Sequence, residues 1–270
     1  MPAKLAPDRQ RGLIVAVGDL RSDGGRMPLF SRLLAQVSPQ PRVVVLVTAD
    51  LAEDDGDLDT VLLGAGAGDV RRQVLQARAD SEQRALLDAV EHAQVVLLHA
   101  TQALRLSTLV GGTSLARAIR RRNAEGMAVL GCEAGAALLC EHMLAHGAEE
   151  GATPRRGGAS LAPGLGLTNR IVIDQGGHAS DRLGRLLAAL ALNPFALGLG
   201  LDTGTAAVIG ADNVLEVVGS GGATLIDPAE MHDSNAAELE HGAPIRITNL
   251  RLHALTGGAR YDLDFRRTVD

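Results

Sequence analysis

The chain has 270 residues, enough for one large domain, and its 46% hydrophobic content and 32 glycines suit an α/β fold with many tight turns. Aromatic residues make up 1% of the chain and the formal net charge is −6, which argues against a nucleic-acid-binding surface. No apolar run approaches the roughly 20 residues that span a bilayer, and the polar N-terminus lacks the apolar core of a secretory signal. We therefore expect a cytoplasmic protein that binds neither nucleic acid nor membrane.

Short continuous apolar runs, typical of the buried strands of a parallel sheet, recur along the chain. They predict strands at residues 13–17, 43–47, 61–63, 95–98, 128–130, 171–173, 206–209, 214–218 and 224–226. The alternating polarity of residues 245–252 predicts an edge strand.

Helices are predicted between these runs, the first from apolar residues at i, i+3, i+4 and i+7 that Pro39 then stops. The predicted helices cover residues 30–37, 69–92 with a break near residue 80, 114–125, and 181–192. The helix over 114–125 carries four arginines, which we interpret as a solvated basic face. No linker or internal repeat divides the chain, so we expect one domain over residues 12–270 after a loose arm at residues 1–11.

The stretch over residues 129–137 has the sequence pattern of a nucleophile elbow. An apolar run ends at Gly131, and Gly-x-Glu-x-Gly then leads into a helix. Glycines on both sides of such a turn let one side chain rise above the sheet edge, and that side chain is usually a serine or cysteine activated by a histidine. Here the tip of the predicted elbow is Glu133.

The two cysteines lie eight residues apart, Cys132 at the elbow and Cys140 about two turns along the helix predicted after it. That placement disfavours a disulfide, and two cysteines alone make no zinc site. We interpret both as buried free thiols.

Four segments, taken together and in order, resemble the cyanophycinase family of serine exopeptidases over about residues 12–227. They are the Leu-Arg-Leu-Ser-Thr-Leu-Val-Gly-Gly-Thr run at 104–113, the strand and elbow at 125–137, the Asp-Gln pair at 174–175 with Arg-Leu-Gly-Arg-Leu at 182–186, and the Gly-Leu-Gly-Leu-Asp run at 198–202.

The resemblance implies a doubly wound, mostly parallel sheet with helices on both faces, of the class I glutamine amidotransferase-like kind, and a homodimer. It also implies a role in releasing β-Asp-Arg dipeptides from cyanophycin, a poly-aspartate with arginine on each side chain. The family's chemistry uses a serine at the elbow, a histidine base and backbone amides that hold the oxyanion.

This sequence departs from the family pattern at the reacting positions. The nucleophilic serine corresponds to Glu133, and the histidine that follows the Asp-Gln pair corresponds to Gly176. The Gly-Gly-Asp-Gln that lines the family site corresponds to residues 100–103, Ala-Thr-Gln-Ala, and the Gly-Gly after the first strand to Gly18-Asp19. Nucleophile, base and pocket glycines have thus changed together.

The first hypothesis is a cyanophycinase-like protein that has lost serine peptidase activity and is retained as a binding or partner protein. A carboxylate cannot form the usual acyl-enzyme by serine chemistry, but Glu133 suits the guanidinium of an arginyl group through a bidentate pair. Its partner would be cyanophycin or an arginine-containing peptide, with an active homologue open as another. The predicted ligand-binding residues are Glu133, Gln102, Arg105, Asp174 and Gln175.

The second hypothesis is an active hydrolase of β-Asp-Arg-type peptides with a rebuilt site. Glu133 would then be a carboxylate nucleophile or general base, assisted by His178 or by His99 at the end of the neighbouring strand.

A third alternative is a metal site, since His142 and His146 follow Glu141 at a spacing that chelates zinc on a helix. No third ligand is evident, and a solvent-facing pair is the favoured interpretation. We therefore predict no metal and no cofactor.

Overall fold

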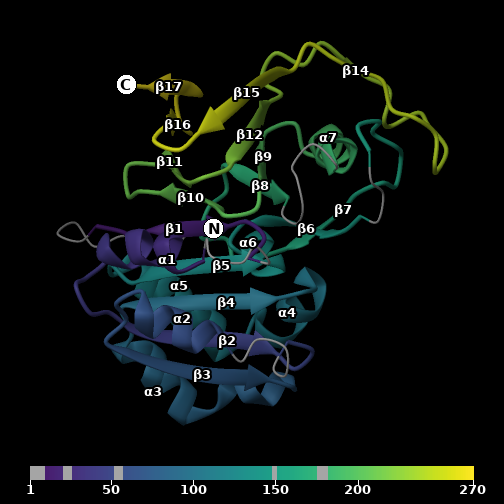
Figure 1. Cartoon of the computed structure of the whole chain (residues 1–270). Coiled ribbons are helices and arrows are strands. Elements are labelled where there is room, and N and C mark those ends of the chain that lie inside the picture. The colour runs from purple at the N-terminus through teal and green to yellow at the C-terminus, as the bar shows by residue number, and fades with distance from the viewer. Residues whose placement is uncertain (1–9, 21–25, 52–56, 148–150, 175–181) are drawn as a thin grey trace.

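The computed structural model describes residues 10–20, 26–51, 57–147, 151–174 and 182–270. Its largest unit is a nine-stranded sheet in the order β17-β16-β11-β10-β1-β5-β4-β2-β3 (Figure 1). The strands from β3 to β1 pair in parallel, and those from β10 to β17 extend the sheet with antiparallel pairs. The parallel strands are β1 (Ile14–Val17), β2 (Arg42–Thr48), β3 (Asp69–Leu75), β4 (Val95–Ala100) and β5 (Ala128–Glu133).

The remaining strands complete this sheet and form three smaller ones. The antiparallel strands of the large sheet are β10 (Thr205–Ile209), β11 (Val214–Gly219), β16 (Arg260–Asp262) and β17 (Arg267–Val269). A second sheet has the order β15-β12-β9-β8, with β8 (Ile171–Asp174), β9 (Leu197–Leu201), β12 (Gly222–Asp227) and β15 (Arg251–Thr256). Two pairs stand apart, β6 (His142–His146) with β7 (Ser160–Pro163), and β13 (Asp233–Ser234) with β14 (Ile247–Thr248).

Helices cover both faces of the parallel strands, which confirms the predicted fold class. Side chains alternate along β1, so that Val15 and Val17 join a core with α1 and α2, while Ile14 and Ala16 join a core with α3, α4 and α5. A third core packs α7 against the second sheet. The helices are α1 (Arg26–Ala35), α2 (Leu58–Gly64), α3 (Arg84–His92), α4 (Ala103–Val110), α5 (Ser114–Ala124), α6 (Ala134–Leu138) and α7 (Leu183–Leu192), with a 3₁₀ turn at Arg78–Glu82.

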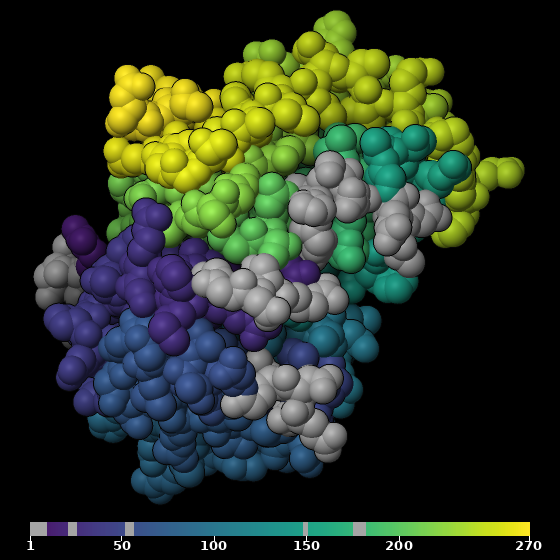
Figure 2. All heavy atoms as spheres, viewed as in Figure 1, coloured from purple at the N-terminus to yellow at the C-terminus, as the bar shows by residue number. Residues whose placement is uncertain are grey.

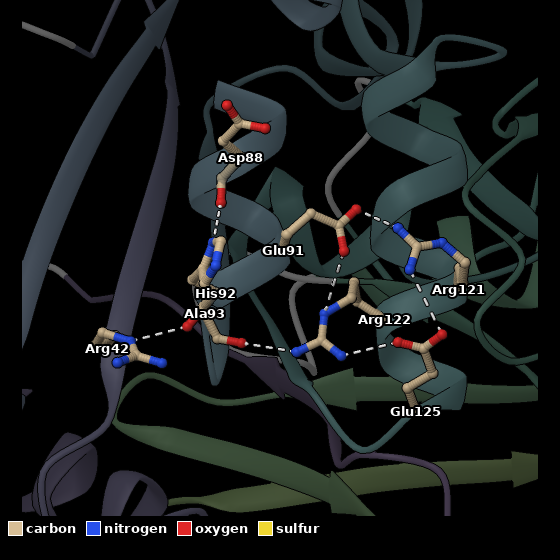
Figure 3. A network of polar contacts seen from close by, with 8 residues as sticks. All are labelled: Arg42, Asp88, Glu91, His92, Ala93, Arg121, Arg122 and Glu125. Atoms are coloured by element: carbon tan, nitrogen blue, oxygen red, sulfur yellow. Dashed lines mark hydrogen bonds and ion pairs between the residues drawn. The ribbon is translucent and has the colours of Figure 1, made fainter. Parts of the chain in front are cut away.

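Arginines of α5 tie this helix to α3 (Figure 3). Glu91 of α3 contacts both Arg121 and Arg122, and Glu125, just after α5, contacts the same two guanidinium groups at 3.5 and 2.9 Å. Part of the predicted solvated basic face therefore cross-links two helices.

Two predicted elements are wrong in type: one predicted strand is a helix, and part of one predicted helix is a strand. Residues 61–63, predicted as a strand, lie in α2, because Leu58, Val61 and Leu62 take helical spacing and are all buried. Residues 69–75, predicted as helix, form β3, whose polar side chains suit its place at the edge of the sheet.

The predicted helix after the elbow is also much shorter than expected. It ends at Leu138, and Cys140 forms an isolated bridge with Thr168 instead of lying two turns along a helix. The segment from His142 to His146 is strand β6, with a register shift near His146, so the helical spacing that suggested a zinc pair is absent. Among the described helices, none has the length and apolar content needed to cross a membrane.

Candidate active site

The turn between β5 and α6 has the geometry of a nucleophile elbow. Glu133 is the last residue of β5 and precedes α6 directly, with φ 51° and ψ −128°. A residue with a Cβ atom rarely adopts this conformation, which costs of order 1–3 kcal/mol and is found mainly at functional sites. The elbow predicted from the sequence is present with Glu133 at its tip.

The two glycines of the elbow pattern are required by close backbone packing. A Cβ on Gly131 would lie 2.4 Å from the carbonyl oxygen of Gly135, and a Cβ on Gly135 would lie 2.1 Å from that of Leu98. Both distances are below van der Waals contact, so α6 can approach the end of β5 and β4 this closely only with glycine at both positions.

Within the described residues, His99 lies in electrostatic contact with the elbow carboxylate. It lies on β4, where His99 pairs with Cys132 and Ala100 pairs with Glu133. His99 Nε2 lies 3.8 Å from Glu133 Oε1, and the two side chains are 5% and 21% exposed. At this distance the pair is an electrostatic contact longer than a hydrogen bond. One of the two predicted histidines thus lies beside the elbow.

A cavity of about 500 Å³ lies beside the elbow. Ala134, directly after Glu133, contributes to its wall, together with residues of α4, β6, β8 and α7. The lining residues are Thr101, Gln102, Ala103, Leu104, Ala134, Leu144, Ala145, His146, Gly147, Asp174, Arg182 and Arg185.

Asp174, predicted to bind ligand, is already paired within the chain. Arg185 Nε donates to Asp174 Oδ2 at 2.9 Å and Arg185 Nη2 bonds the other carboxylate oxygen, which makes a bidentate pair. The side chains are 5% and 11% exposed, so the pair closes one wall of the cavity and leaves Asp174 little free charge.

A second acid–arginine pair lies beside the N-terminal turn of α4. The Asp50 carboxylate accepts a hydrogen bond from Thr101 Oγ1 and lies 3.4 Å from Arg105 Nη1. Burial raises the pKa of Asp50, but the hydrogen bond from Thr101 and the charge of Arg105 are among the contacts that bring it below its usual value. Arg105, another predicted ligand residue, is therefore paired with a carboxylate of the same chain.

The predicted site residues are placed together only in part. Gln102 and Asp174 line the cavity, whereas Gln175, Gly176 and His178 lie outside the described residues. Of the histidines considered for zinc, His146 lines the cavity from strand β6.

Sequence reasoning missed Asp50 and Arg185. In the sequence, Arg185 stands out only as part of the Arg-Leu-Gly-Arg-Leu run. Asp50 could have been found from its position just after a buried strand, because such residues lie at the edge of the sheet where ligands bind.

Both cysteines are buried and neither forms a disulfide, as predicted. Burial raises the pKa of the Cys140 thiol to about 12, which keeps it protonated and unreactive at neutral pH. Cys132 points away from solvent although it neighbours the elbow tip.

Comparisons with known proteins find a family match, related sequences and a similar fold. Residues 13–217 match the model of peptidase family S51. A protein of Synechococcus elongatus named cyanophycinase is 33% identical over 261 residues, which is 96% of this chain and 77% of the relative. Another cyanophycinase, from Trichormus variabilis, is 37% identical over 205 residues, 76% of this chain and 68% of the relative. The crystal structure of a peptidase from an acI-B1 Actinobacterium superposes with a TM-score of 0.66 at 15% identity, covering 94% of this chain and 98% of that one.

Proposed function

The chain belongs to peptidase family S51, and from that premise we propose that it is a cyanophycinase-like protein that binds arginine-bearing aspartyl peptides without serine peptidase chemistry. Its relatives' name supports cyanophycin as the ligand class. The observation that carries the rest is the elbow, which keeps its strained backbone while presenting the carboxylate of Glu133.

The side chain at the tip of the elbow argues against the family's serine mechanism. Serine peptidases form an ester between the hydroxyl of the nucleophile and the substrate acyl group, and a histidine takes the hydroxyl proton. Glu133 has no hydroxyl to acylate, and its carboxylate would repel the oxyanion that develops on a substrate carbonyl bound beside it. This substitution supports the proposed loss of serine chemistry at the elbow.

The negative side chain of Glu133 favours a cationic ligand group at the elbow. The cavity beside the elbow is itself lined by Arg182 and by Asp174, which Arg185 neutralises, and nearby Asp50 is paired with Arg105. Within the described residues, the one ion-pair contact of Glu133 is with His99, and at 3.8 Å it leaves the carboxylate able to accept other hydrogen bonds. A guanidinium would form a charge-assisted, bidentate pair there.

The size of the cavity is compatible with this ligand. At about 500 Å³ it falls within the range of roughly 300–1,000 Å³ typical of small-molecule sites. The uncharged polar groups of Thr101 and Gln102 on its wall offer partners for the peptide and carboxylate groups of an aspartyl-arginine unit bound beside the elbow.

The test uses insoluble cyanophycin and the full chain. After incubation, the amount of protein that sediments with the polymer and the amount of dipeptide released are measured for the wild type and for Glu133→Gln, which keeps the shape of the side chain but removes its charge. We expect sedimentation without release in the wild type and at least about tenfold weaker binding in the variant. Dipeptide release by the wild type, or equal binding by the variant, would contradict the proposal.

The contact between His99 and Glu133 favours one alternative, an active hydrolase with a rebuilt site. In this mechanism Glu133 would attack substrate or activate water, and His99 would move the proton. Mass spectrometry of the protein after incubation with β-Asp-Arg peptides distinguishes the two functions. If turnover is found and is lost in both Glu133→Gln and His99→Gln, or if Glu133 carries a covalent adduct, the protein is a hydrolase and the binding function is rejected.

A further inference from the structure

A second cavity, of about 330 Å³, lies at the amino ends of strands β2 and β3. The parallel strands run from left to right in Figure 1, so these ends lie at the edge of the sheet opposite the elbow. The start of β2 is level with the start of β5, because Val43 pairs with Val95 and Val95 pairs with Ala128. Glu133 follows at the other end of β5, roughly 17 Å further at about 3.3 Å per residue. The cavity is therefore separate from the one beside the elbow.

The cavity lies between the two strands and helix α3. Arg42 pairs with Asp69 and Val44 pairs with Arg71, and alternate residues of a strand share one face of the sheet. Val44 belongs to the core that contains α3, so this face of β2 and β3 is the one that α3 covers. The blue segment that contains β3 and α3 forms the lower end of the molecule in Figure 2.

Hydrogen bonds hold the end of α3 against this wall of the cavity (Figure 3). Arg42 Nε donates to the carbonyl oxygen of His92 at 2.9 Å, and Arg122 Nη2 donates to that of Ala93 at 3.3 Å. His92 Nδ1 lies 2.8 Å from the carbonyl oxygen of Asp88. These contacts satisfy carbonyl groups at a helix end, which have no partner within the helix, and they fix the lining side chains before any ligand binds.

The charged side chains that line the cavity keep unused bonding capacity. They are Arg42, Asp69, Arg71, Asp88 and His92. Among the described residues, no ion pair joins either of these arginines to either aspartate, and the side chains of Asp69 and Arg71 have no hydrogen bond. Arg84, outside the cavity, lies 3.9 Å from Asp88 in an exposed pair, which is worth little. Groups of both signs thus face one cavity without neutralising each other across it.

This lining matches a ligand that carries a carboxylate and an ammonium group. The guanidinium of Arg71 and the two Nη atoms of Arg42 are donors for a carboxylate. The carboxylates of Asp69 and Asp88 accept from an ammonium group. Since a carbonyl oxygen only accepts, the contact with Asp88 places the proton of a neutral His92 ring on Nδ1, which leaves Nε2 as a further acceptor.

The rest of the lining suits a small aliphatic side chain. Val44 and Ala93, 3% and 1% exposed, contribute to the wall together with Ala89 of α3. The volume of about 330 Å³ is at the lower end of the range of roughly 300–1,000 Å³ found for small-molecule sites. A small apolar wall within a charged rim is the arrangement that an amino acid needs.

We propose that this cavity binds an aliphatic α-amino acid in its zwitterionic form, with the carboxylate at Arg42 and Arg71 and the ammonium group at Asp69 and Asp88. The proposal concerns the edge of the sheet opposite the elbow and does not depend on the proposed function.

Calorimetric titration of the wild-type chain tests the need for both charges. The probes are L-leucine, N-acetyl-L-leucine, which lacks the ammonium group, and L-leucine methyl ester, which lacks the carboxylate. We expect L-leucine to bind saturably and each analogue to bind at least about tenfold more weakly. Absence of saturable binding of L-leucine up to about 20 mM, or equal affinity for L-leucine and either analogue, would overturn the proposal.

Charge-removing variants place the ligand. We expect Arg71→Gln and Asp69→Asn each to weaken L-leucine binding at least about tenfold. The matched controls Arg32→Gln on α1 and Glu240→Gln remove exposed charges away from the cavity and should leave binding unchanged. Circular dichroism establishes that each variant is folded. Full binding by Arg71→Gln and Asp69→Asn, or binding that is lost in Glu133→Gln instead, would overturn the proposal.

A steric variant tests the same cavity without changing its charge. Ala89→Leu fills part of the cavity from α3, whereas Ala85→Leu adds the same atoms at an exposed position of the same helix that does not line it. We expect at least about tenfold weaker L-leucine binding in Ala89→Leu and wild-type binding in Ala85→Leu. Equal affinities of these two variants would contradict binding in this cavity.

Discussion

In the part of the chain that the structure describes, two turns hold a charged residue at positive φ, and their backbone strain is offset differently. Glu133 at the elbow has φ 51°, and Arg266 in the turn between β16 and β17 has φ 52°. The guanidinium of Arg266 pairs with the buried carboxylate of Asp227 and bonds a backbone carbonyl, so its contacts offset the strain. The carboxylate of Glu133 has only the 3.8 Å contact with His99 among the described residues.

This difference is what the proposed function expects if the Arg266 turn is structural and the Glu133 turn is a ligand site. Strain persists where the surrounding structure forces it, and it accumulates at sites where a ligand or a reaction uses the resulting geometry. Tight glycine packing forces the conformation of Glu133, while its side chain gains little from it within the chain. Four substitutions and one titration test this contrast, from the largest expected effect on stability to the smallest.

Asp227→Ala should have the largest effect. The substitution leaves two arginines without their buried partner, and because Arg266 and Arg251 are themselves partly exposed we expect a loss of about 3 kcal/mol in the free energy of unfolding. Urea denaturation measures it. The control Asp233→Ala breaks an exposed pair with Arg246 and should cost less than about 1 kcal/mol. Equal losses of unfolding free energy in both variants would show that the Asp227 contacts stabilise the fold no more than an exposed ion pair does.

Gly135→Ala should destabilise the elbow by about 2 kcal/mol. The new Cβ would lie 2.1 Å from a backbone oxygen that cannot move without disturbing β4. The control Gly242→Ala adds a Cβ where no atom lies within 4 Å, although its φ of 84° still adds some strain. If Gly135→Ala costs no more than Gly242→Ala, close packing does not force the elbow conformation.

Glycine substitutions at the two strained residues should change stability in opposite directions. Arg266→Gly relieves backbone strain but loses the pair with Asp227, so we expect a net loss of about 2 kcal/mol. Glu133→Gly relieves strain and loses only the His99 contact, so we expect a gain of about 1 kcal/mol together with lost ligand binding. Denaturation curves for both variants measure this, and a destabilised Glu133→Gly would mean that the elbow side chain stabilises the fold.

The titration of the Tyr261 hydroxyl tests the burial of the region around Asp227. Its effect on stability appears only at high pH, so it is the smallest at neutral pH. Burial, and then the charge of Asp227, raise the pKa of Tyr261 to about 12, against an ordinary value of about 10. Because the unfolded chain releases this proton first, stability should fall as the pH rises from about 10 to about 12. Tyr261 is the only tyrosine and there is no tryptophan, so absorbance at 295 nm follows this group alone. Ionisation near pH 10 in the folded protein would show that the ring is not buried.

Much of the fold could be predicted because burial and periodicity agree locally. The apolar runs at residues 13–17, 43–47 and 95–98 are central strands, and the Gly-x-Glu-x-Gly pattern marks the elbow because its glycines are needed at the backbone. The edge strand β3 was mistaken for a helix, since an exposed strand needs no continuous apolar run.

The site was harder to predict because its pairs form between distant segments. The pairing of Asp174 with Arg185, and of Asp50 with Arg105, depends on which strand ends meet at the cavity, which single-residue patterns do not contain. The short α6 likewise depends on tertiary contacts, since an alanine- and leucine-rich sequence after the elbow favours a longer helix than the five residues that form.

The most direct test of the account is calorimetric titration of the wild type with β-Asp-Arg dipeptide and with the same dipeptide carrying citrulline, the uncharged isostere of arginine. The account predicts that the arginine dipeptide binds without turnover, that the citrulline dipeptide binds at least about tenfold more weakly, and that Glu133→Gln removes this preference. Equal affinity for both dipeptides, or a preference for arginine that persists in Glu133→Gln, would contradict the claim that the elbow carboxylate has become a guanidinium ligand.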